Sequence, residues 1–407
     1  MPTRRTISVG SLREFIDVEV AGGLVLLIGA ALALAWANLG ASGQYEDFWR
    51  TPARLGLGPF ALDLELRHWI NDLLMALFFF VVGLEIKREL VDGELRGARR
   101  AALPAIAALG GMAVPALIYF AINPSGAPAR GWGIPMATDI AFAVGVLALF
   151  GRRIPLGLKV FLLSLAIVDD IGAIAVIAIF YAANIGLVPL ALSAASVAAV
   201  AASWRARPPL RRPLLFLLAA VAWTALNASG VHPTIAGVAL GLSVPAGPDP
   251  EPSPAERLGH VLHPWTSFGV VPVFALANAG VVLPAGGLSA ALGHPVAAGI
   301  VAGLVAGKLL GISLASYLAV RLGLAVLPAG VGWGSLIGVA ALGGIGFTVS
   351  LFIAELAFKD RALADAAKVG VLAGSTLAAT LGCLLLAVLP RVARRSSAGD
   401  QPGRSSQ

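Results

Sequence analysis

LGLKVFLLSLAIVDDIGAIAVIAIFY, residues 156–181, is the segment that most clearly indicates the architecture of this chain. It is apolar almost throughout, and its charged residues are Lys159 near the start and the adjacent Asp169 and Asp170 near the middle. A helix rises about 1.5 Å per residue, so this stretch is long enough to cross roughly 30 Å of hydrocarbon. Because the apolar residues are continuous and do not alternate, they favour a membrane helix over a strand of a membrane barrel.

Similar apolar blocks recur along the 407-residue chain, which is 58% hydrophobic and only 13% charged. Such a composition excludes a water-soluble globule with a polar exterior. We therefore predict an all-α membrane protein with about twelve transmembrane helices. The predicted spans are residues 18–39, 67–90, 101–122, 131–150, 156–181, 187–203, 213–227, 230–245, 264–283, 296–320, 332–357 and 367–390.

The net charge of +7 does not require a nucleic-acid partner, because the positions of the basic residues explain it. If both termini are cytoplasmic, the inner segments hold about three times as many Lys and Arg as the outer ones, as the positive-inside bias requires. We expect a multi-pass protein of the bacterial inner (plasma) membrane, in contact with the lipid bilayer. We predict that residues 1–395 form one polytopic transporter domain with a cytoplasmic linker at about 245–259, and that residues 396–407 form a disordered cytoplasmic tail. The single cysteine, Cys383, excludes an intramolecular disulfide.

Four charged residues lie near the midpoints of predicted spans, at a similar depth: Asp139, Asp169, Asp170 and Lys308. A charge at the centre of a span costs about 2.5 to 3.5 kcal/mol on insertion scales, so such residues usually line an ion pathway. The alternative is that they are structural ion pairs between helices. Three carboxylates and one amine at a shared depth favour the functional interpretation.

Two spans contain residues that break helices. Pro135 precedes Asp139 by one turn, and Gly343, Gly344 and Gly346 cluster beside Thr348 in another span. A pair of discontinuous helices in corresponding parts of a chain is typical of transporter sites. Close helix packing would also account for the glycines taken alone.

The chain resembles the NhaA-type sodium/proton antiporters over nearly its whole length. The matching motifs are FFVVGLEIKREL (79–90), ATDIAFA (137–143), AIVDD (166–170), SGVH (229–232), HVLHPW (260–265), FALANAG (274–280) and GIGFT (344–348). The resemblance implies two inverted repeats, around spans 3–5 and 10–12, with discontinuous crossing helices in spans 4 and 11, and a homodimer. It also implies roles for individual residues: Asp169 and Asp170 match the acidic pair of the ion site, Thr138 and Asp139 the unwound stretch of span 4, and Lys308 the lysine of span 10.

Sodium is a hard cation that prefers oxygen ligands, which suits Asp170 together with Asp169, Thr138 and backbone carbonyls. Protons compete for the same carboxylate oxygens, so occupancy by Na⁺ and by H⁺ is mutually exclusive. We expect Lys308 to pair with Asp169 and Asp139 to compensate the dipole ends of the broken helices. The predicted function is exchange of cytoplasmic Na⁺, and also Li⁺, for external H⁺ in pH and sodium homeostasis. We expect no enzyme activity and no cofactor.

Candidates for a pH response are the charged cluster at the inner end of the second span (Glu85, Lys87, Arg88 and Glu89) and the histidines His232, His260 and His263. The alternatives are a solvated helix end and histidines with ordinary hydrogen bonds. Gly259 stands where the family often carries an acidic residue, which bears on pH regulation and not on transport.

The sequence can be compared with the patterns of two other functional classes. An intramembrane aspartyl protease would carry Tyr-Asp and Gly-x-Gly-Asp motifs, and neither is in the sequence. A sodium-coupled symporter on the same architecture remains the alternative to exchange, and it would need a cavity for a second substrate.

Overall fold

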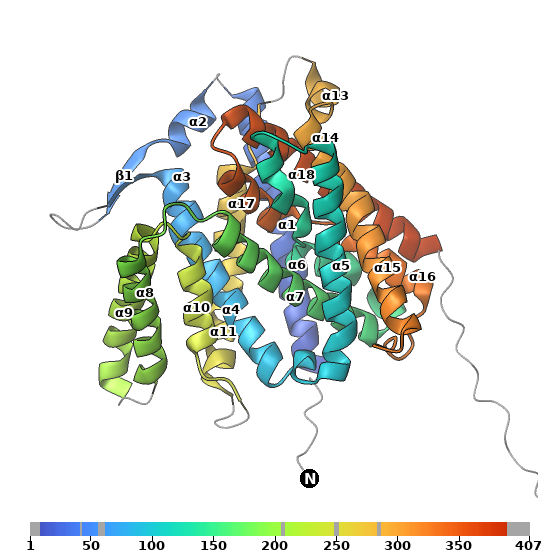
Figure 1. Ribbon diagram of the computed structural model, residues 1–407, viewed down its shortest axis with the longest axis horizontal. Helices are drawn as coiled ribbons and strands as arrows, with labels where there is room; N and C mark the ends of the chain where they lie inside the picture. Colours follow the sequence, from blue (N-terminus) through green and yellow to red (C-terminus); the bar gives the residue numbers. More distant parts are fainter. Residues whose placement is uncertain are drawn as a thin grey trace, which may run out of the picture.

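The computed structural model describes residues 9–40, 43–55, 62–204, 208–247, 252–282 and 286–388, and it is mostly helical (Figure 1). Six helical segments of the described chain are long and apolar enough to cross a membrane. They are α1 (Val9–Leu39, apolar from Val20), α3–η2–α4 (Leu66–Trp69, Ile70–Leu74, Met75–Val91), α5 (Ala98–Ile122), α7 (Leu156–Phe180), α14–η7–α15 (Pro295–Ala302, Gly303–Gly307, Lys308–Arg321) and α18 (Arg361–Val388). Each coincides with a predicted span to within a few residues.

Two further apolar segments are bent pairs of short helices. The 3₁₀-helix η4 (Pro128–Met136) meets α6 (Ile140–Ala148) at 42°, and α16 (Trp333–Leu342) meets α17 (Phe347–Ala357) at 44°. Both breaks lie where the sequence predicts them. Pro135 removes a backbone donor just before the first break, and glycines occupy the second.

The other helices are shorter or less apolar. Three are apolar helices: α8 (Leu187–Ser203), α9 (Pro208–Ala228) and α10 (Thr234–Ser243). The remaining ones are α2 (Gln44–Trp49), η3 (Glu94–Arg96), η5 (Gly151–Arg153), α11–η6–α12 (Pro254–Trp265, Thr266–Val270, Val271–Asn278) and α13 (Gly287–Leu292). Length and composition support six spans in the described chain, or eight if each bent pair is one span. Twelve spans stay a prediction.

A short hairpin is an exception to the predicted all-helical architecture. Strands β1 (Pro52–Leu55) and β2 (Leu62–Glu65) pair antiparallel, with Pro52 opposite Glu65. The hairpin lies beside α2, outside the long apolar helices (Figure 1). The prediction overlooked it because strands this short carry too few residues for an alternating pattern to stand out.

Residues 254–259 of the predicted linker 245–259 are helical, because α11 begins at Pro254. Ser253 and Glu256 form a capping box: the Ser253 hydroxyl accepts from the Glu256 amide, and the Glu256 carboxylate accepts from the Ser253 amide. Residues 248–251 of this linker and the predicted tail 396–407 lie outside the described residues.

The breaks of the two bent pairs lie in the interior, where residues 137–139 and 343–348 are buried. Helices α8 and α9 pack against each other at one edge of the molecule, and α15 and α16 lie at the opposite edge (Figure 1). Between them, Phe79 of α4, Phe274 of α12 and Phe352 of α17 are almost fully buried and in ring contact. The charged residues near the breaks, Asp139, Asp169, Asp170 and Lys308, are buried as well.

Candidate ion-binding site

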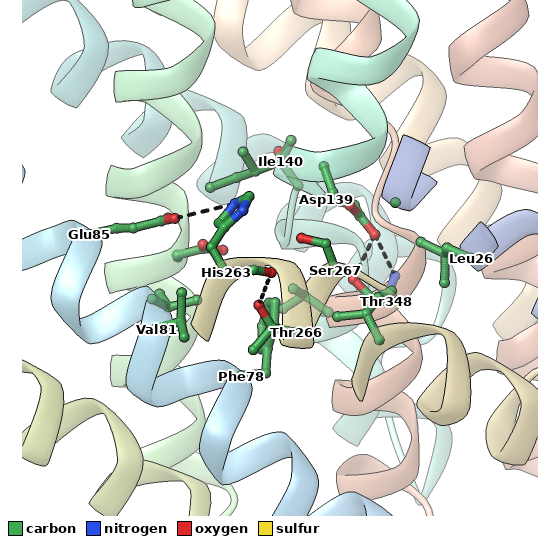
Figure 2. A pocket seen from close by; sticks show the side chains of 17 residues that line it. Leu26, Phe78, Val81, Glu85, Asp139, Ile140, His263, Thr266, Ser267 and Thr348 are labelled. Carbon is green, nitrogen blue, oxygen red and sulfur yellow. Dashed lines mark hydrogen bonds and ion pairs between the residues drawn. The ribbon is translucent and has the colours of Figure 1, made fainter. Parts of the chain in front are cut away.

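Asp139 joins the two helix breaks. As the N-cap of α6, it accepts a hydrogen bond on Oδ1 from the Phe142 amide at 3.0 Å. Its other oxygen, Oδ2, accepts from the Thr348 amide at 3.1 Å and from the Thr348 hydroxyl at 2.6 Å, at the start of α17 (Figure 2). Its own amide donates to the Ile345 carbonyl at 2.6 Å. One aspartate thus meets the N-terminal ends of two helices, where negative charge is favoured.

The breaks are joined at two further points. The Thr138 hydroxyl lies 2.7 Å from the Gly343 carbonyl oxygen, and the Ser350 hydroxyl donates to the Ile134 carbonyl at 2.7 Å. Thr138 and Ser350 have no exposed surface. These hydroxyl groups satisfy the backbone carbonyls of Gly343 and Ile134, which would bond within the helix if it were unbroken.

Asp169 and Lys308 form an ion pair whose two side chains are fully buried. Lys308 reaches it from α15, immediately after the π-helical turn η7, and Asp169 from the middle of α7. The Thr138 hydroxyl lies 2.6 Å from Asp169 Oδ2 and accepts from Lys308 Nζ at 3.0 Å. The predicted pairing of Lys308 with Asp169 is present, and Thr138 links it to the helix breaks.

The second oxygen of Asp169, Oδ1, is buried and has no hydrogen-bond partner within the described part of the chain. A buried carboxylate oxygen without a partner is costly, so it would be stabilised by any cation or donor that reaches it.

Asp170 occupies a different position from its neighbour. It lines a cavity of about 50 Å³ that Thr138, Asp139 and Thr348 also line, whereas Asp169 is not part of the cavity wall. A single water needs only about 10 to 15 Å³ measured in this way, so the cavity has room for a small ion with some of its water. The two adjacent aspartates therefore have different surroundings: Asp169 is paired with an amine, and Asp170 faces a space that an ion can occupy.

The opposite wall of this cavity was not predicted from the sequence. Thr266 and Ser267 line it from the π-helical turn η6, and Gly22 and Leu26 line it from α1 (Figure 2). A methyl group added at Gly22 would lie 2.9 Å from Ser267 Cβ, so α1 packs closely on this turn. The available signal was this pair of adjacent hydroxyl residues inside an apolar block. The turn that carries them is π-helical in the structure, a form that is frequent at functional sites.

The residues predicted to respond to pH are dispersed. Glu85 lines the cavity together with His263, 4.0 Å away, whereas Glu89 is buried against Ser164 of α7 at 3.5 Å. Lys87 and Arg88 are half-buried on α4 outside the cavity wall, and His260 is exposed. His232 lies 3.4 Å from Asp72 and is not part of the cavity wall. Of the predicted histidines, the structure brings only His263 to the site.

Comparison with known proteins identifies the family. The chain matches the family described as Na⁺/H⁺ antiporter 1 over residues 13–386. It is 47% identical to Na(+)/H(+) antiporter NhaA 3 of Frankia alni, over 96% of this chain and 92% of that protein. It is 50% identical to Na(+)/H(+) antiporter NhaA of Salmonella typhimurium (91% and 96%) and 48% identical to NhaA 1 of Klebsiella pneumoniae (93% and 97%). With this coverage, the chain belongs to the NhaA family of Na⁺/H⁺ antiporters, as the sequence motifs predicted.

Proposed function

We propose that this protein exchanges cytoplasmic Na⁺, and also Li⁺, for external H⁺ at Asp170. Membership in an antiporter family supports exchange of sodium for protons. The observation that supports Asp170 as the site is the cavity that this carboxylate lines together with Thr138, Asp139 and Thr348. Sodium prefers such oxygen ligands, and protons bind the same carboxylate, so each cation excludes the other.

Asp169 contributes the second carboxylate of the proposed site. Its Oδ1, which has no hydrogen-bond partner among the described residues, is available as an acceptor, while Oδ2 is held by Lys308 and Thr138. A sodium ion bound to Asp170 that also reached Asp169 would compete with the ammonium group of Lys308. In this scheme Lys308 is the proton or ion-pair partner of the site, and an amine suits that role because, unlike arginine, it can lose its proton when buried.

Asp139 is proposed to compensate the partial charges of the broken helices. Its three accepted hydrogen bonds, from Phe142 and from Thr348, occupy both carboxylate oxygens. It therefore has less capacity to bind an ion than Asp170 has, although it lines the same cavity.

The direction of exchange follows from the proposed topology together with the inward proton gradient. We place twelve helices across the bacterial inner membrane with both termini inside, and two inverted repeats crossing at the bent pairs η4–α6 and α16–α17. Glu85 and His263, toward the inner end of their spans, then mark the cytoplasmic entrance, where a pH response would act on ion entry. His232 and Asp72 would lie on the outer side. The inward proton gradient would drive sodium out, which serves pH and sodium homeostasis, and we expect a homodimer as in resembling proteins.

A sodium-coupled symporter, the alternative raised by the sequence, would bind a second substrate beside the ion. The cavity at Asp170 is far smaller than the roughly 300 to 1,000 Å³ of pockets that hold drug-sized ligands. This size favours exchange of small cations.

The test is sodium-driven proton movement in proteoliposomes that contain a pH-sensitive dye. Wild type should move protons on addition of Na⁺ or Li⁺ between pH 6 and 9, and Asp170→Asn should not. Asp63→Asn, which changes an exposed aspartate of the hairpin, is the matched control and should behave as wild type. Unchanged exchange in a well-expressed Asp170→Asn protein would refute the assignment to Asp170. Sodium uptake that depends on an organic solute and moves no protons would favour the symporter.

A further inference from the structure

The start of α17 presents three successive backbone amides to the protein interior. Gly346, Phe347 and Thr348 are buried, and the amides of a first helical turn have no partner within their own helix. In a buried position each needs an acceptor from elsewhere. Asp139 supplies one, for the amide of Thr348.

Ser375 of α18 supplies the acceptor for the other two amides. Its hydroxyl oxygen accepts from the Gly346 amide and from the Phe347 amide, both at 3.2 Å, and its side chain is only 3% exposed. Ser375 is separated from this break by nearly thirty residues of chain. The end of α17 is therefore held from two sides, by Asp139 of the first bent pair and by Ser375 of the last helix.

Small residues bring α18 close enough for this contact. A methyl group added at Gly370 would lie 2.9 Å from Ala297 Cα, and one added at Gly374 would lie 3.0 Å from Leu304 Cδ1, so α18 packs tightly on α14 and η7. One turn after Ser375, Ala378 lies against the break itself, 2.9 Å from a methyl group placed on Gly344. The face of α18 that carries Ser375 is thus the wall behind the break.

We propose that Ser375 is a positioning residue for ion exchange, which holds the start of α17 so that the groups around the ion keep their places. This inference rests on the proposed function. The connection runs through the break: the Gly343 carbonyl, three residues before Gly346, is contacted by Thr138, whose hydroxyl also contacts Asp169. Without Ser375, Asp139 is the only described side chain that still accepts from an amide at this helix end, and we expect it to be drawn toward α17 and away from α6.

Three substitutions at Ser375 distinguish the effect of losing the hydroxyl group from the effect of changing the side-chain volume. Ser375→Ala removes the acceptor. Ser375→Thr keeps it and adds a methyl group, whereas Ser375→Val has nearly the shape of threonine but no hydroxyl. Thr376→Val is the control on the same helix, because the Thr376 hydroxyl is exposed and donates to the Leu372 carbonyl of its own helix.

Both the transport assay and a binding assay are needed. We expect Ser375→Ala and Ser375→Val to raise the apparent KM for Na⁺ about tenfold, the scale of one lost buried hydrogen bond, with the maximal rate changed less than about twofold. Ser375→Thr and Thr376→Val should stay within about twofold of the wild-type KM. The rise in unfolding temperature of the purified protein on adding Na⁺ should shift to higher Na⁺ concentrations in the same two variants.

The Thr/Val pair decides the outcome even if Ser375→Ala fails to fold. Equal KM values for Ser375→Thr and Ser375→Val, or a loss of maximal rate without a change in KM, would overturn the positioning role. If the wild-type protein moves no protons in response to Na⁺, the proposed function itself fails. If the wild-type protein exchanges Na⁺ for H⁺ and all Ser375 variants behave as it does, only the positioning role of Ser375 fails.

Discussion

Asp169 and Lys308 form an ion pair whose side chains have no solvent exposure at all, and the Thr138 hydroxyl contacts both partners. Such a pair must offset the large cost of removing two charges from water, so it is weak evidence for a purely stabilising role. Breaking it from one side is expensive, because the remaining charge stays buried. Its place beside two helix breaks makes it the natural centre for tests of stability and transport together.

Lys308→Met should lower the free energy of unfolding by about 3 kcal/mol, because it leaves the Asp169 carboxylate buried without its counter-charge. Adding Asp169→Asn to Lys308→Met should recover most of this loss without restoring exchange. Unfolding in a denaturing detergent measures both values. Lys359→Met, which changes an exposed lysine, is the control and should shift stability by less than about 0.5 kcal/mol. If the losses of unfolding free energy caused by Lys308→Met and Asp169→Asn simply added in the double variant, the energetic coupling between the two residues would be contradicted.

The two adjacent aspartates should differ when each is changed to asparagine. Asp170→Asn should abolish sodium-driven proton movement with stability within about 1 kcal/mol of wild type, because Asp170 lies on a cavity wall. Asp169→Asn should cripple exchange and also destabilise the protein by about 3 kcal/mol, because Lys308 loses its partner. Thermal unfolding and the proteoliposome assay, run on the same preparations, check both. Equal stability losses would show that the two positions are equivalent.

Asp139→Ala should destabilise more than the loss of an ordinary N-cap, which costs about 0.5 to 2 kcal/mol, because it removes an acceptor from the ends of both α6 and α17. Asp139→Asn keeps one acceptor oxygen and should fall between Asp139→Ala and wild type. The measurement is unfolding in detergent, with Asp360→Ala at the start of α18 as an exposed N-terminal comparison. A smaller loss for Asp139→Ala than for Asp360→Ala would contradict the shared-cap geometry.

Glu46, which lies outside the candidate spans, is the centre of a charged cluster that predicts a pH effect on stability. Glu46 of α2 binds Arg67 through two hydrogen bonds, at 3.0 and 3.1 Å, and Arg361 of α18 at 2.8 Å. Burial opposes ionisation of Glu46, but the hydrogen bonds and charge of Arg67, together with Arg361, lower its pKa below the ordinary value of 4.5.

A lowered folded-state pKa means that the stabilisation is complete above pH 4.5 and is lost as the pH falls through the folded value. Glu46→Gln should therefore lower the free energy of unfolding at pH 7 by about 1 to 3 kcal/mol and flatten its decline below pH 4.5. Thermal unfolding from pH 3 to 8 measures this. Arg50→Gln is the control, since Arg50 lies 3.8 Å from Glu46 and is largely exposed. If the stability of wild type and Glu46→Gln fell identically below pH 4.5, the proposed contribution of the ionised Glu46 to stability would be contradicted.

The sequence predicted much of the architecture because a membrane imposes a strong constraint on composition. A segment of about twenty apolar residues must be helical in lipid, so the long helices, such as Leu156–Phe180, were found to within a few residues. The breaks at Pro135 and at Gly343–Gly346 followed from local backbone chemistry. Shorter or capped elements were less visible: α11 begins at Pro254 because of the capping box at Ser253, and the hairpin β1–β2 is too short to give a pattern.

The four charges Asp139, Asp169, Asp170 and Lys308 could be singled out from the sequence, since they stand in apolar blocks whatever the packing. How they differ from one another could be seen only in the folded protein. Which carboxylate pairs with Lys308, which caps two helices and which faces a cavity depends on contacts between residues more than a hundred positions apart, such as Asp139 with Thr348. The same holds for Ser375, whose neighbours in sequence give no sign of the break that it contacts. Hydropathy depends on each residue and its neighbours along the chain, whereas hydrogen bonds and cavities depend on which helices meet.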